Sequence, residues 1–416
     1  MRLIDNETHF QQLNLCVSNF QKTIELIEFN RTLILYEAEW NSKDSLNLLF
    51  VLVENETLPM IYYNNLGWQF NEIYSIDCFH RFHSSKGQLR YLNTHEYDRT
   101  VIIECSFIEP LIDEQNLSMS LILTHRQNKN LLTLNIDLCW LIFPRLRIGH
   151  CHKALFEDVP FYMLEQWLDY HLLLGVEQFY IYDRTLKFRS TLQRYIDLNQ
   201  VIYIEFPLAK QILNRERFNW IDQFVGKMHC LMRTRRTFQW LGTWDFDEYL
   251  NFFAPNENIF IRKSSRSSSM LSEYLENNFY RYNNIIIYAV NFMTKRSLTL
   301  DQHDGNHPVL IEQYQHRVNQ WNDRVKYFVR PNHCRIINIH YALFITDNST
   351  YESFLPNPSR IFPASPQTLI RINHYSSGQI NRDELFLALH QGPVEYVHDP
   401  LLYRVAKTLH SLNNQQ

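Results

Sequence analysis

Glycine is scarce in this chain: only 9 of its 416 residues are glycine, whereas average usage in proteins is about 7%. No two glycines stand at the spacing of a GxGxxG fingerprint or a P-loop, the two glycine-rich backbone cradles that bind nucleotide phosphates. If the protein binds a nucleotide, side chains or a metal ion must therefore contact the phosphates.

The cysteines and the apolar stretches lack other familiar patterns. None of the seven cysteines belongs to a CxxC motif, which excludes zinc-ribbon and thioredoxin-like sites. No window approaches the roughly 18 consecutive apolar residues of a membrane helix. The N-terminal residues 1–14 also lack the basic and apolar regions of a signal peptide. Taken as given, the chain is expected to have no membrane span and to be cytoplasmic if it is complete.

The charged residues exclude one large class of partners. The formal net charge is −4 at pH 7, and no long run of Lys or Arg occurs, whereas proteins that bind nucleic-acid phosphates carry basic patches. The one basic cluster, Arg233, Arg235 and Arg236, lies just before an acidic motif and is interpreted as part of a local site. We therefore expect no nucleic-acid partner.

The first third of the chain is typical of β-structure. Short apolar or alternating segments are separated by polar stretches, a spacing that indicates an antiparallel, sandwich-like domain. The expected strands are residues 23–29, 32–40, 46–53, 100–108, 118–125 and 131–143. No catalytic constellation occurs among them, so this part is interpreted as a stem or a carbohydrate-binding accessory domain.

From residue 146 onwards, helix-like and strand-like segments alternate. The expected strands are residues 147–156, 176–183, 201–207 and 238–250, and the expected helices between them are residues 159–174, 190–200 and 218–236. Gly175 is the stop signal of the first helix. Such alternation is typical of a parallel α/β sheet, in which ligands bind beyond the carboxyl ends of the strands.

Acidic residues stand at the carboxyl ends of two of these expected strands. Asp183 ends the second strand, and the end of the fourth carries Asp245 and Asp247. Two carboxylates at this spacing can bind a divalent cation such as Mn²⁺ or Mg²⁺, which prefer oxygen ligands. The same pattern occurs in solvated turns, so the spacing leaves both interpretations open. His374 is either a third ligand or a structural histidine, and Glu248 is either a helix N-terminal acid or a partner of the metal-binding acids.

Several longer segments, in this order, resemble glycosyltransferase family 92. They are "MLEQWLDYHLLLGVEQFYIYDR", "CLMRTRRTFQWLGTWDFDEYL", "KYFVRP", "NIHYAL" and "RINHYSSG". The resemblance runs from about Cys151 to about Leu389, and the first third of the chain carries no motif that matches. Several matching segments in the order of the family are far more specific evidence for it than the two aspartates alone.

The resemblance implies an α/β fold of the GT-A type, with a Rossmann-like, mostly parallel sheet flanked by helices. Residues 1–145 would then be a β-rich accessory or stem domain, and residues 146–416 the catalytic domain. It also implies an inverting, metal-dependent enzyme that transfers a hexose from a UDP-sugar, most often UDP-galactose, to a glycan acceptor with a β linkage. Members of the family work in the Golgi, which makes the secretory pathway the expected location.

Site residues follow from the resemblance by position. Asp245 and Asp247 would bind Mn²⁺, or Mg²⁺, that bridges the donor diphosphate, and His374 would complete the metal or phosphate site. Asp183 would contact the uridine or its ribose. Further donor-binding positions are Glu165, Gln223 and Arg233, with Lys326 and Arg330 offsetting the charge of the diphosphate.

The resemblance leaves the catalytic base and the final function open. An inverting transfer needs a carboxylate that takes the proton of the acceptor hydroxyl, and Asp304 and Glu312 lie in the right general region. Two other functions compete with the transferase: a catalytically silent glycan-binding protein on the same fold, and a metal-dependent hydrolase of sugar nucleotides.

Overall fold

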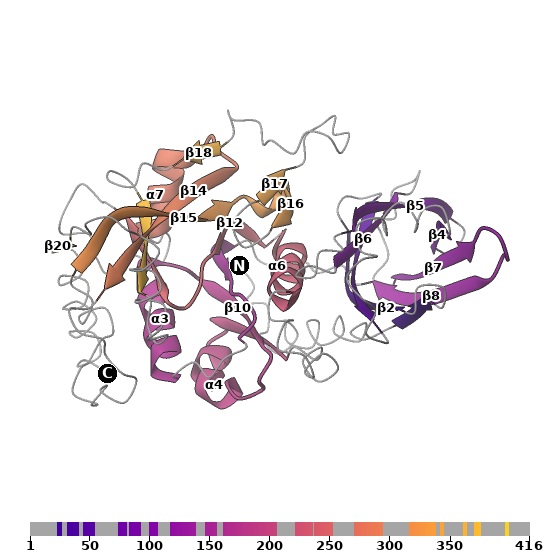
Figure 1. The fold of residues 1–416 in the computed structure, drawn as a ribbon, viewed down its shortest axis with the longest axis horizontal. Coiled ribbons are helices and arrows are strands. Elements are labelled where there is room, and N and C mark those ends of the chain that lie inside the picture. Colours follow the sequence, from indigo (N-terminus) through magenta and orange to yellow (C-terminus); the bar gives the residue numbers. More distant parts are fainter. Residues whose placement is uncertain are drawn as a thin grey trace, which may run out of the picture. The chain divides into compact units, whose positions relative to one another are not determined.

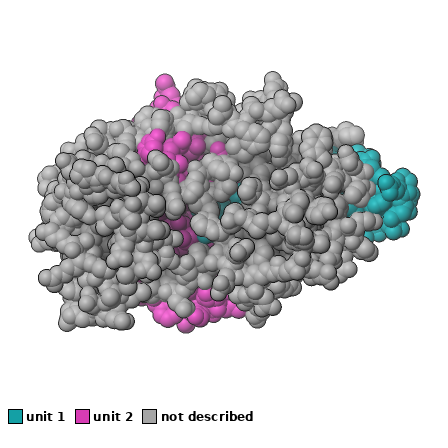
Figure 2. Space-filling model, in the orientation of Figure 1, with its two compact units in different colours: residues 1–144, 210–233 teal, residues 145–209, 234–416 magenta. Residues whose placement is uncertain are grey.

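The computed structural model describes residues 23–26, 31–40, 45–54, 74–80, 83–92, 100–106, 117–138, 146–155, 161–205, 221–235, 237–252, 270–293, 316–337, 342–344, 361–363, 370–375 and 396–398 (Figure 1). The chain divides into two compact units (Figure 2), the first of residues 1–144 and 210–233 and the second of residues 145–209 and 234–416. Compactness assigns no role to either unit, so the division into an accessory and a catalytic domain stays a prediction.

The first unit contains an eight-stranded antiparallel sheet. Its strands are β1 (Thr23–Leu26), β2 (Arg31–Trp40), β3 (Ser45–Glu54), β4 (Tyr74–His80), β5 (His83–Leu92), β6 (Thr100–Ser106), β7 (Leu117–His125) and β8 (Leu131–Leu138). They lie in the order β1-β2-β3-β6-β5-β4-β7-β8. The two outermost strands, β1 and β8, also contact each other, so the sheet curls round on itself (Figure 1). The unit also includes α6 (Ile221–Thr234) up to Arg233.

The predicted antiparallel strands of this unit are confirmed, but two further strands, β4 and β5, were not predicted. In β4, Tyr74, Ile76 and Cys78 are buried and alternate with residues that are not, which is the period of two expected of a sheet with one buried face. β5 opens with the polar residues "HSSK", which hide its strand character. The strands also form one continuous sheet, and not the two packed sheets of a sandwich.

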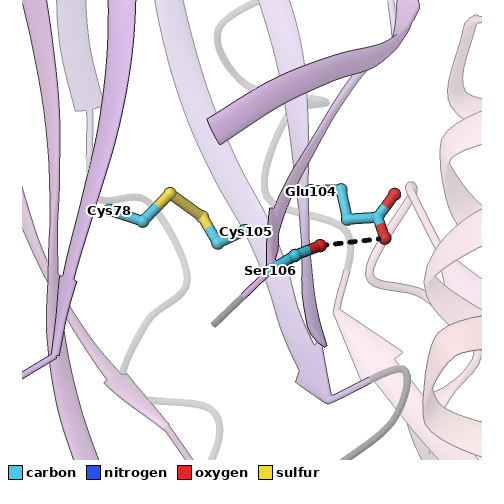
Figure 3. Close-up of a disulfide and its surroundings, with 4 residues drawn as sticks. All are labelled: Cys78, Glu104, Cys105 and Ser106. Atoms are coloured by element: carbon cyan, nitrogen blue, oxygen red, sulfur yellow. Dashed lines mark hydrogen bonds between the residues drawn. A yellow bond between two sulfur atoms is a disulfide. The ribbon is translucent and has the colours of Figure 1, made fainter. Parts of the chain in front are cut away.

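A disulfide between Cys78 of β4 and Cys105 of β6 crosses over β5, which lies between these strands (Figure 3). Gly87 of β5 pairs with Cys105. A Cβ atom at Gly87 would overlap the side chain of Ile76 and lie 3.2 Å from the Cys78 sulfur. The missing side chain at Gly87 therefore leaves the space that the disulfide and its neighbours fill. Beside the disulfide, the Ser106 hydroxyl donates to Glu104 at 3.5 Å.

The second unit contains a mixed ten-stranded sheet. Its strands are β9 (Leu146–Cys151), β10 (Gln178–Asp183), β11 (Val201–Glu205), β12 (Phe238–Thr243), β13 (Glu248–Phe252), β14 (Asn284–Met293), β15 (His316–Val329), β18 (Ile361–Pro363), β19 (Ile370–Tyr375) and β20 (Tyr396–His398). The main order is β11-β10-β9-β12-β15-β14-β19-β13, with β18 beside β14 and β20 beside β15. β11, β10, β9 and β12 are mutually parallel, and β15 is antiparallel to β12.

Helices and short elements complete the second unit. α3 (Phe161–Leu174) joins β9 to β10, and α4 (Arg189–Asp197) joins β10 to β11. The remaining elements are α7 (Met270–Phe279), the 3-10 turn η7 (Pro331–His333) and a two-stranded sheet of β16 (Cys334–Ile337) and β17 (Ala342–Phe344). The unit is thus of the mixed α/β class, as predicted.

Local sequence explains why the parallel strands and α3 form where they do. Every residue of β10, "QFYIYD", is buried, as expected of a parallel strand covered on both faces. α3 buries one stripe that includes Leu164, Trp167, Leu168 and His171. It ends at Gly175, whose φ of 107° lies in the left-handed region that glycine adopts without strain.

The strand predicted over residues 238–250 is two strands, which corrects the sequence-based assignment. β12 ends at Thr243, and after a turn β13 begins at Glu248 and pairs with β19 at the far end of the sheet order. Hydrogen bonds within residues 245–248 close this turn. The carboxylates therefore lie after the end of β12 and not within a continuous strand.

Candidate functional site

The acidic turn, residues Asp245–Glu248, lies where the order of the parallel strands reverses. The chain steps from β9 to β10 to β11 on one side and then places β12 on the other side of β9. In open α/β sheets, ligands bind at such a reversal, beyond the carboxyl ends of the strands. Because the acidic turn directly follows β12, both its position and its chemistry mark it as the candidate site.

Two hydrogen bonds close the acidic turn. The Glu248 N–H donates to the Asp245 carbonyl oxygen at 3.0 Å, and the Asp245 N–H donates to Glu248 Oε2 at 2.7 Å. Glu248 is buried, whereas Asp245 and Asp247 are half-buried. No helix follows, because Glu248 begins β13. Glu248 is therefore a partner of the neighbouring groups, and not a helix N-terminal acid.

Two lysines from different strands face the acidic turn. Lys326 Nζ lies 3.0 Å from Asp245 Oδ2 and 3.0 Å from Glu248 Oε2. Lys153 Nζ lies 3.4 Å from the same Asp245 oxygen. The sheet explains both positions: Thr243 at the end of β12 pairs with Tyr327 of β15, next to Lys326, and Lys153 follows the carboxyl end of the neighbouring strand β9.

The surroundings of both lysines favour the charged form. Burial alone would lower the pKa of Lys326, but Asp245 and Glu248 more than offset burial and raise its pKa above the ordinary value. Burial also opposes the charge of Lys153, and Asp245 and Asp247 again raise its pKa. Among the described residues, these three carboxylates and two ammonium groups together carry one net negative formal charge.

Helix α3 holds the strand that follows the acidic turn. The indole N–H of Trp167 donates to the Glu248 carbonyl oxygen at 2.8 Å, and the Tyr170 hydroxyl donates to the Leu250 carbonyl oxygen at 2.7 Å. Trp167 and Tyr170 are buried on the inner stripe of α3. The start of β13 is therefore positioned by side chains that come from the helix between β9 and β10.

His171 of α3 joins both flanks of the acidic turn. Its Nδ1 lies 2.8 Å from the Trp167 carbonyl oxygen, and its Nε2 accepts from the Trp244 indole at 3.1 Å and the Leu250 N–H at 3.3 Å. These contacts assign the hydrogen to Nδ1 of a neutral ring. Burial lowers the pKa of His171 to about 3, so the ring is neutral at physiological pH.

Asp183, predicted to contact the uridine or its ribose, organises the loop after β10. Its Oδ1 accepts from the Thr185 N–H, the Thr185 hydroxyl and the Leu186 N–H at 2.8, 2.8 and 2.9 Å. Its Oδ2 accepts from the Phe188 N–H and the Tyr203 hydroxyl, each at 2.8 Å. The carboxylate is fully buried. These bonds fix the entry into α4, and a contact with a nucleotide stays a prediction.

Glu165 and Arg330, both predicted to bind the donor, have their described contacts elsewhere. Glu165 Oε1 lies 3.8 Å from Arg194 of α4. Arg330 stacks 4.1 Å from the centre of the Trp240 ring and lies 3.1 Å from Glu276 of α7. Arg330 directly follows β15 and lies four residues, about 13 Å of extended chain, beyond Lys326. Lys326 and Arg330 were both predicted to offset the charge of the diphosphate, and the structure places Lys326 against the acidic turn.

The other predicted site residues are placed less directly. Gln223 and Arg233 lie on α6 in the first unit, so their roles stay predictions. The backbone of His374 lies opposite Glu248 in the pairing of β19 with β13, next to the acidic turn. The two candidate bases, Asp304 and Glu312, lie outside the described residues.

The acidic turn carries carboxylates of the kind predicted to bind a divalent cation. Within the part of the chain that the structure describes, no three His, Cys, Asp or Glu residues form a group that could hold a metal ion. Asp245 and Asp247 supply carboxylate oxygens, the ligands that Mn²⁺ and Mg²⁺ prefer. A cation held by two carboxylates keeps positions for waters or phosphate oxygens, and His374 as a further ligand stays a prediction.

Two residues of the site, Lys153 and His171, were not predicted. Lys153 lay within the strand expected over residues 147–156, and its place beyond the carboxyl end became visible only because β9 ends at Cys151. His171 lies on the buried side of a predicted helix. At such a position, the sequence does not distinguish a histidine that only fills the core from one that positions neighbouring groups.

The described helices include none that is long and apolar enough to cross a membrane.

Comparison with known proteins identifies the family. The model of glycosyltransferase family 92 matches residues 147–382. A family 92 protein of Ricinus communis is 33% identical over 93 residues, which cover 22% of this chain and 14% of the relative. One of Arabidopsis thaliana is 28% identical over 121 residues, which cover 29% of this chain and 19% of the relative. The matched segments thus span less than a fifth of these relatives. The family model covers more than half of the chain, which therefore belongs to glycosyltransferase family 92.

Proposed function

We propose that the protein is a metal-dependent, inverting glycosyltransferase of the GT-A type, which moves a hexose, galactose in the first instance, from a UDP-sugar to a glycan acceptor. The observation that carries this proposal is the acidic turn, held at the reversal of the parallel strands in a chain of family 92. The order β11-β10-β9-β12, with helices in the crossovers, supports a nucleotide-binding sheet of Rossmann type.

The chemistry of the transfer suits the charges of this site. The bond between the anomeric carbon and the β-phosphate oxygen breaks, and negative charge develops on the departing UDP. A divalent cation held by Asp245, Asp247 and His374 would stabilise that charge. Lys326, buried between Asp245 and Glu248, keeps both carboxylates in place. These side chains supply what a glycine-rich phosphate loop supplies in other nucleotide-binding proteins.

The acceptor side of the reaction needs a base. As the acceptor hydroxyl oxygen attacks the anomeric carbon, its proton passes to a carboxylate, and Asp304 and Glu312 remain the candidates. We also propose that the reaction takes place in the Golgi. The Cys78–Cys105 disulfide supports an oxidising compartment, because disulfides are rare in the reducing cytosol.

The decisive experiment compares Asp247→Asn with wild type. Release of UDP from UDP-galactose and other UDP-sugars is measured with Mn²⁺ and a mixture of glycan acceptors. We expect the substitution to lower turnover by at least about 100-fold, because a carboxylate ligand is lost where charge develops in the transition state. Asp197 is an exposed acid of α4 that accepts a hydrogen bond from Gln193. Asp197→Asn is the matched control and should keep full activity.

The same measurements separate the competing functions. Turnover by Asp247→Asn equal to that of wild type would sink the metal assignment. UDP release that does not depend on an acceptor would favour a hydrolase. If no UDP-sugar raises the thermal unfolding midpoint of wild type with or without Mn²⁺, donor binding is excluded at the concentrations used, and a glycan-binding protein becomes the better explanation.

A further inference from the structure

The two lysines at the acidic turn differ in how firmly they are held. Lys326 has 2% of its side chain exposed and lies 3.0 Å from each of two carboxylates. Lys153 has 16% of its side chain exposed and lies 3.4 Å from Asp245. Lys326 is part of β15, whereas Lys153 follows the end of β9. Lys326 is therefore the more closely enclosed of the two lysines, and Lys153, which is more exposed, has more room to turn.

The two lysines weaken the attraction of the site for a divalent cation that binds alone. Asp245 Oδ2 already faces both ammonium groups, and the cluster carries three negative and two positive charges. A divalent cation at Asp245 and Asp247 would change the net charge of these groups from −1 to +1, with Lys153 as its mostly buried positive neighbour. Two positive charges that share the Asp245 carboxylate repel each other more in a partly buried site than in water.

A diphosphate would remove this conflict. It brings at least two negative charges to the same place, and a lysine ammonium on its flexible four-carbon stem can turn from a carboxylate to a phosphate oxygen. Asp245 would then exchange Lys153 for the metal, and Lys153 would gain the diphosphate. Lys326 would stay where it is, because it is bonded to Glu248 as well as to Asp245.

We propose that Lys153 is an exchangeable cation that neutralises Asp245 in the empty site and contacts the donor diphosphate in the loaded site. This inference rests on the proposed function. As a consequence, Lys153 lowers the affinity for the metal when no donor is bound and raises the affinity for the donor. Metal and donor therefore bind with positive coupling, and by linkage each raises the affinity for the other by the same factor.

The test measures binding and not catalysis. Dissociation constants of Mn²⁺ alone, UDP alone and UDP with saturating Mn²⁺ are measured by calorimetry for wild type, Lys153→Gln and Lys153→Arg. We expect Lys153→Gln to bind Mn²⁺ alone more tightly and UDP more weakly. Each change should be roughly tenfold, which corresponds to about 1.4 kcal/mol for one charge contact. The coupling between Mn²⁺ and UDP should fall, and Lys153→Arg should keep most of the UDP affinity.

A matched control removes an equivalent charge elsewhere. Lys86 pairs with Asp77 in the first unit, and its side chain is 78% exposed. Lys86→Gln should change neither dissociation constant. Circular dichroism and the unfolding midpoint check that each variant is folded, and Asp245 keeps Lys326 as a partner in all of them.

The outcomes are distinguishable. Opposite changes for Mn²⁺ and UDP in Lys153→Gln support the exchange. Unchanged affinities, or a loss of both, would overturn it, because the lysine would then be either a bystander or a fixed brace of the turn. In either case, the proposed function stands if the wild-type protein binds UDP. If the wild-type protein binds no UDP under any condition, the proposed function and this inference are both overturned.

Discussion

Replacing His171 by glutamine tests whether a neutral, buried histidine holds the acidic turn. In the wild type, His171 Nε2 is the acceptor for the Trp244 indole N–H and the Leu250 N–H. Glutamine cannot reproduce both of these bonds together with the bond to the Trp167 carbonyl oxygen. A buried donor left without an acceptor costs about 1–3 kcal/mol. We therefore expect His171→Gln to lower the free energy of unfolding by about 2–4 kcal/mol at pH 7.5.

The pH dependence gives this prediction its specificity. The pKa of His171 is about 3 in the folded protein and about 6.5 in an unfolded chain. Between these values the unfolded state binds a proton that the folded state does not, so stability is complete above pH 6.5 and falls as the pH is lowered. The slope approaches about 1.4 kcal/mol per pH unit. Because glutamine lacks this ionisation, the deficit of His171→Gln should shrink by about 2 kcal/mol between pH 7 and pH 5.

Urea unfolding at several pH values measures both effects. Hydrogen exchange of the peptide over residues 238–252 restricts the readout to β12, the acidic turn and β13. Trp244→Phe is the matched control: it removes one donor to His171 but keeps the titrating ring, so its deficit should change little with pH. A deficit of His171→Gln that is the same at pH 7 and pH 5 would refute a neutral, buried His171.

Two further predictions concern backbone and cross-links. Gly242→Ala places a Cβ atom into the buried Trp244 ring and 3.1 Å from Phe328, so it should destabilise the second unit by about 1–3 kcal/mol. Because Trp244 precedes Asp245, Gly242→Ala should also weaken Mn²⁺-dependent UDP binding. Unchanged binding would show that the acidic turn tolerates a shift of the Trp244 ring. Replacing Cys78 and Cys105 by serine opens a cross-link that spans 27 residues and should cost about 3.5 kcal/mol of unfolding free energy. Urea unfolding with and without reductant checks this, and a reductant-insensitive wild type would contradict it.

The order of elements in the parallel half of the second sheet was predictable from the sequence. β9, β10 and β11, with α3 and α4 between them, lie within a few residues of the expected segments. Apolar periodicity and the stop signal at Gly175 are local features, which is why they sufficed. The strand assigned over residues 238–250 was wrong in its length, because the turn at Asp245–Glu248 depends on hydrogen bonds that residue type alone does not specify.

The candidate site was predictable only in part. Asp245 and Asp247 stood out by their spacing and by their place after a strand. Lys326 was named because of the family resemblance, and its two carboxylate partners became visible only in the fold. Glu165 and Arg330 have described contacts with Arg194, Trp240 and Glu276, which depend on neighbouring elements that sequence spacing does not reveal.

The sequence by itself determined the succession of strands and helices and the acids that follow β12, because both depend on neighbours along the chain. Only the tertiary structure decided which groups face those acids. Lys326 and Asp245 are 81 residues apart, and His171 and Leu250 are 79 apart, so their contacts exist only once β9, β12 and β15 are paired and α3 is packed. The charge of the acidic turn is therefore a property of the folded sheet, whereas its carboxylates are a property of the sequence.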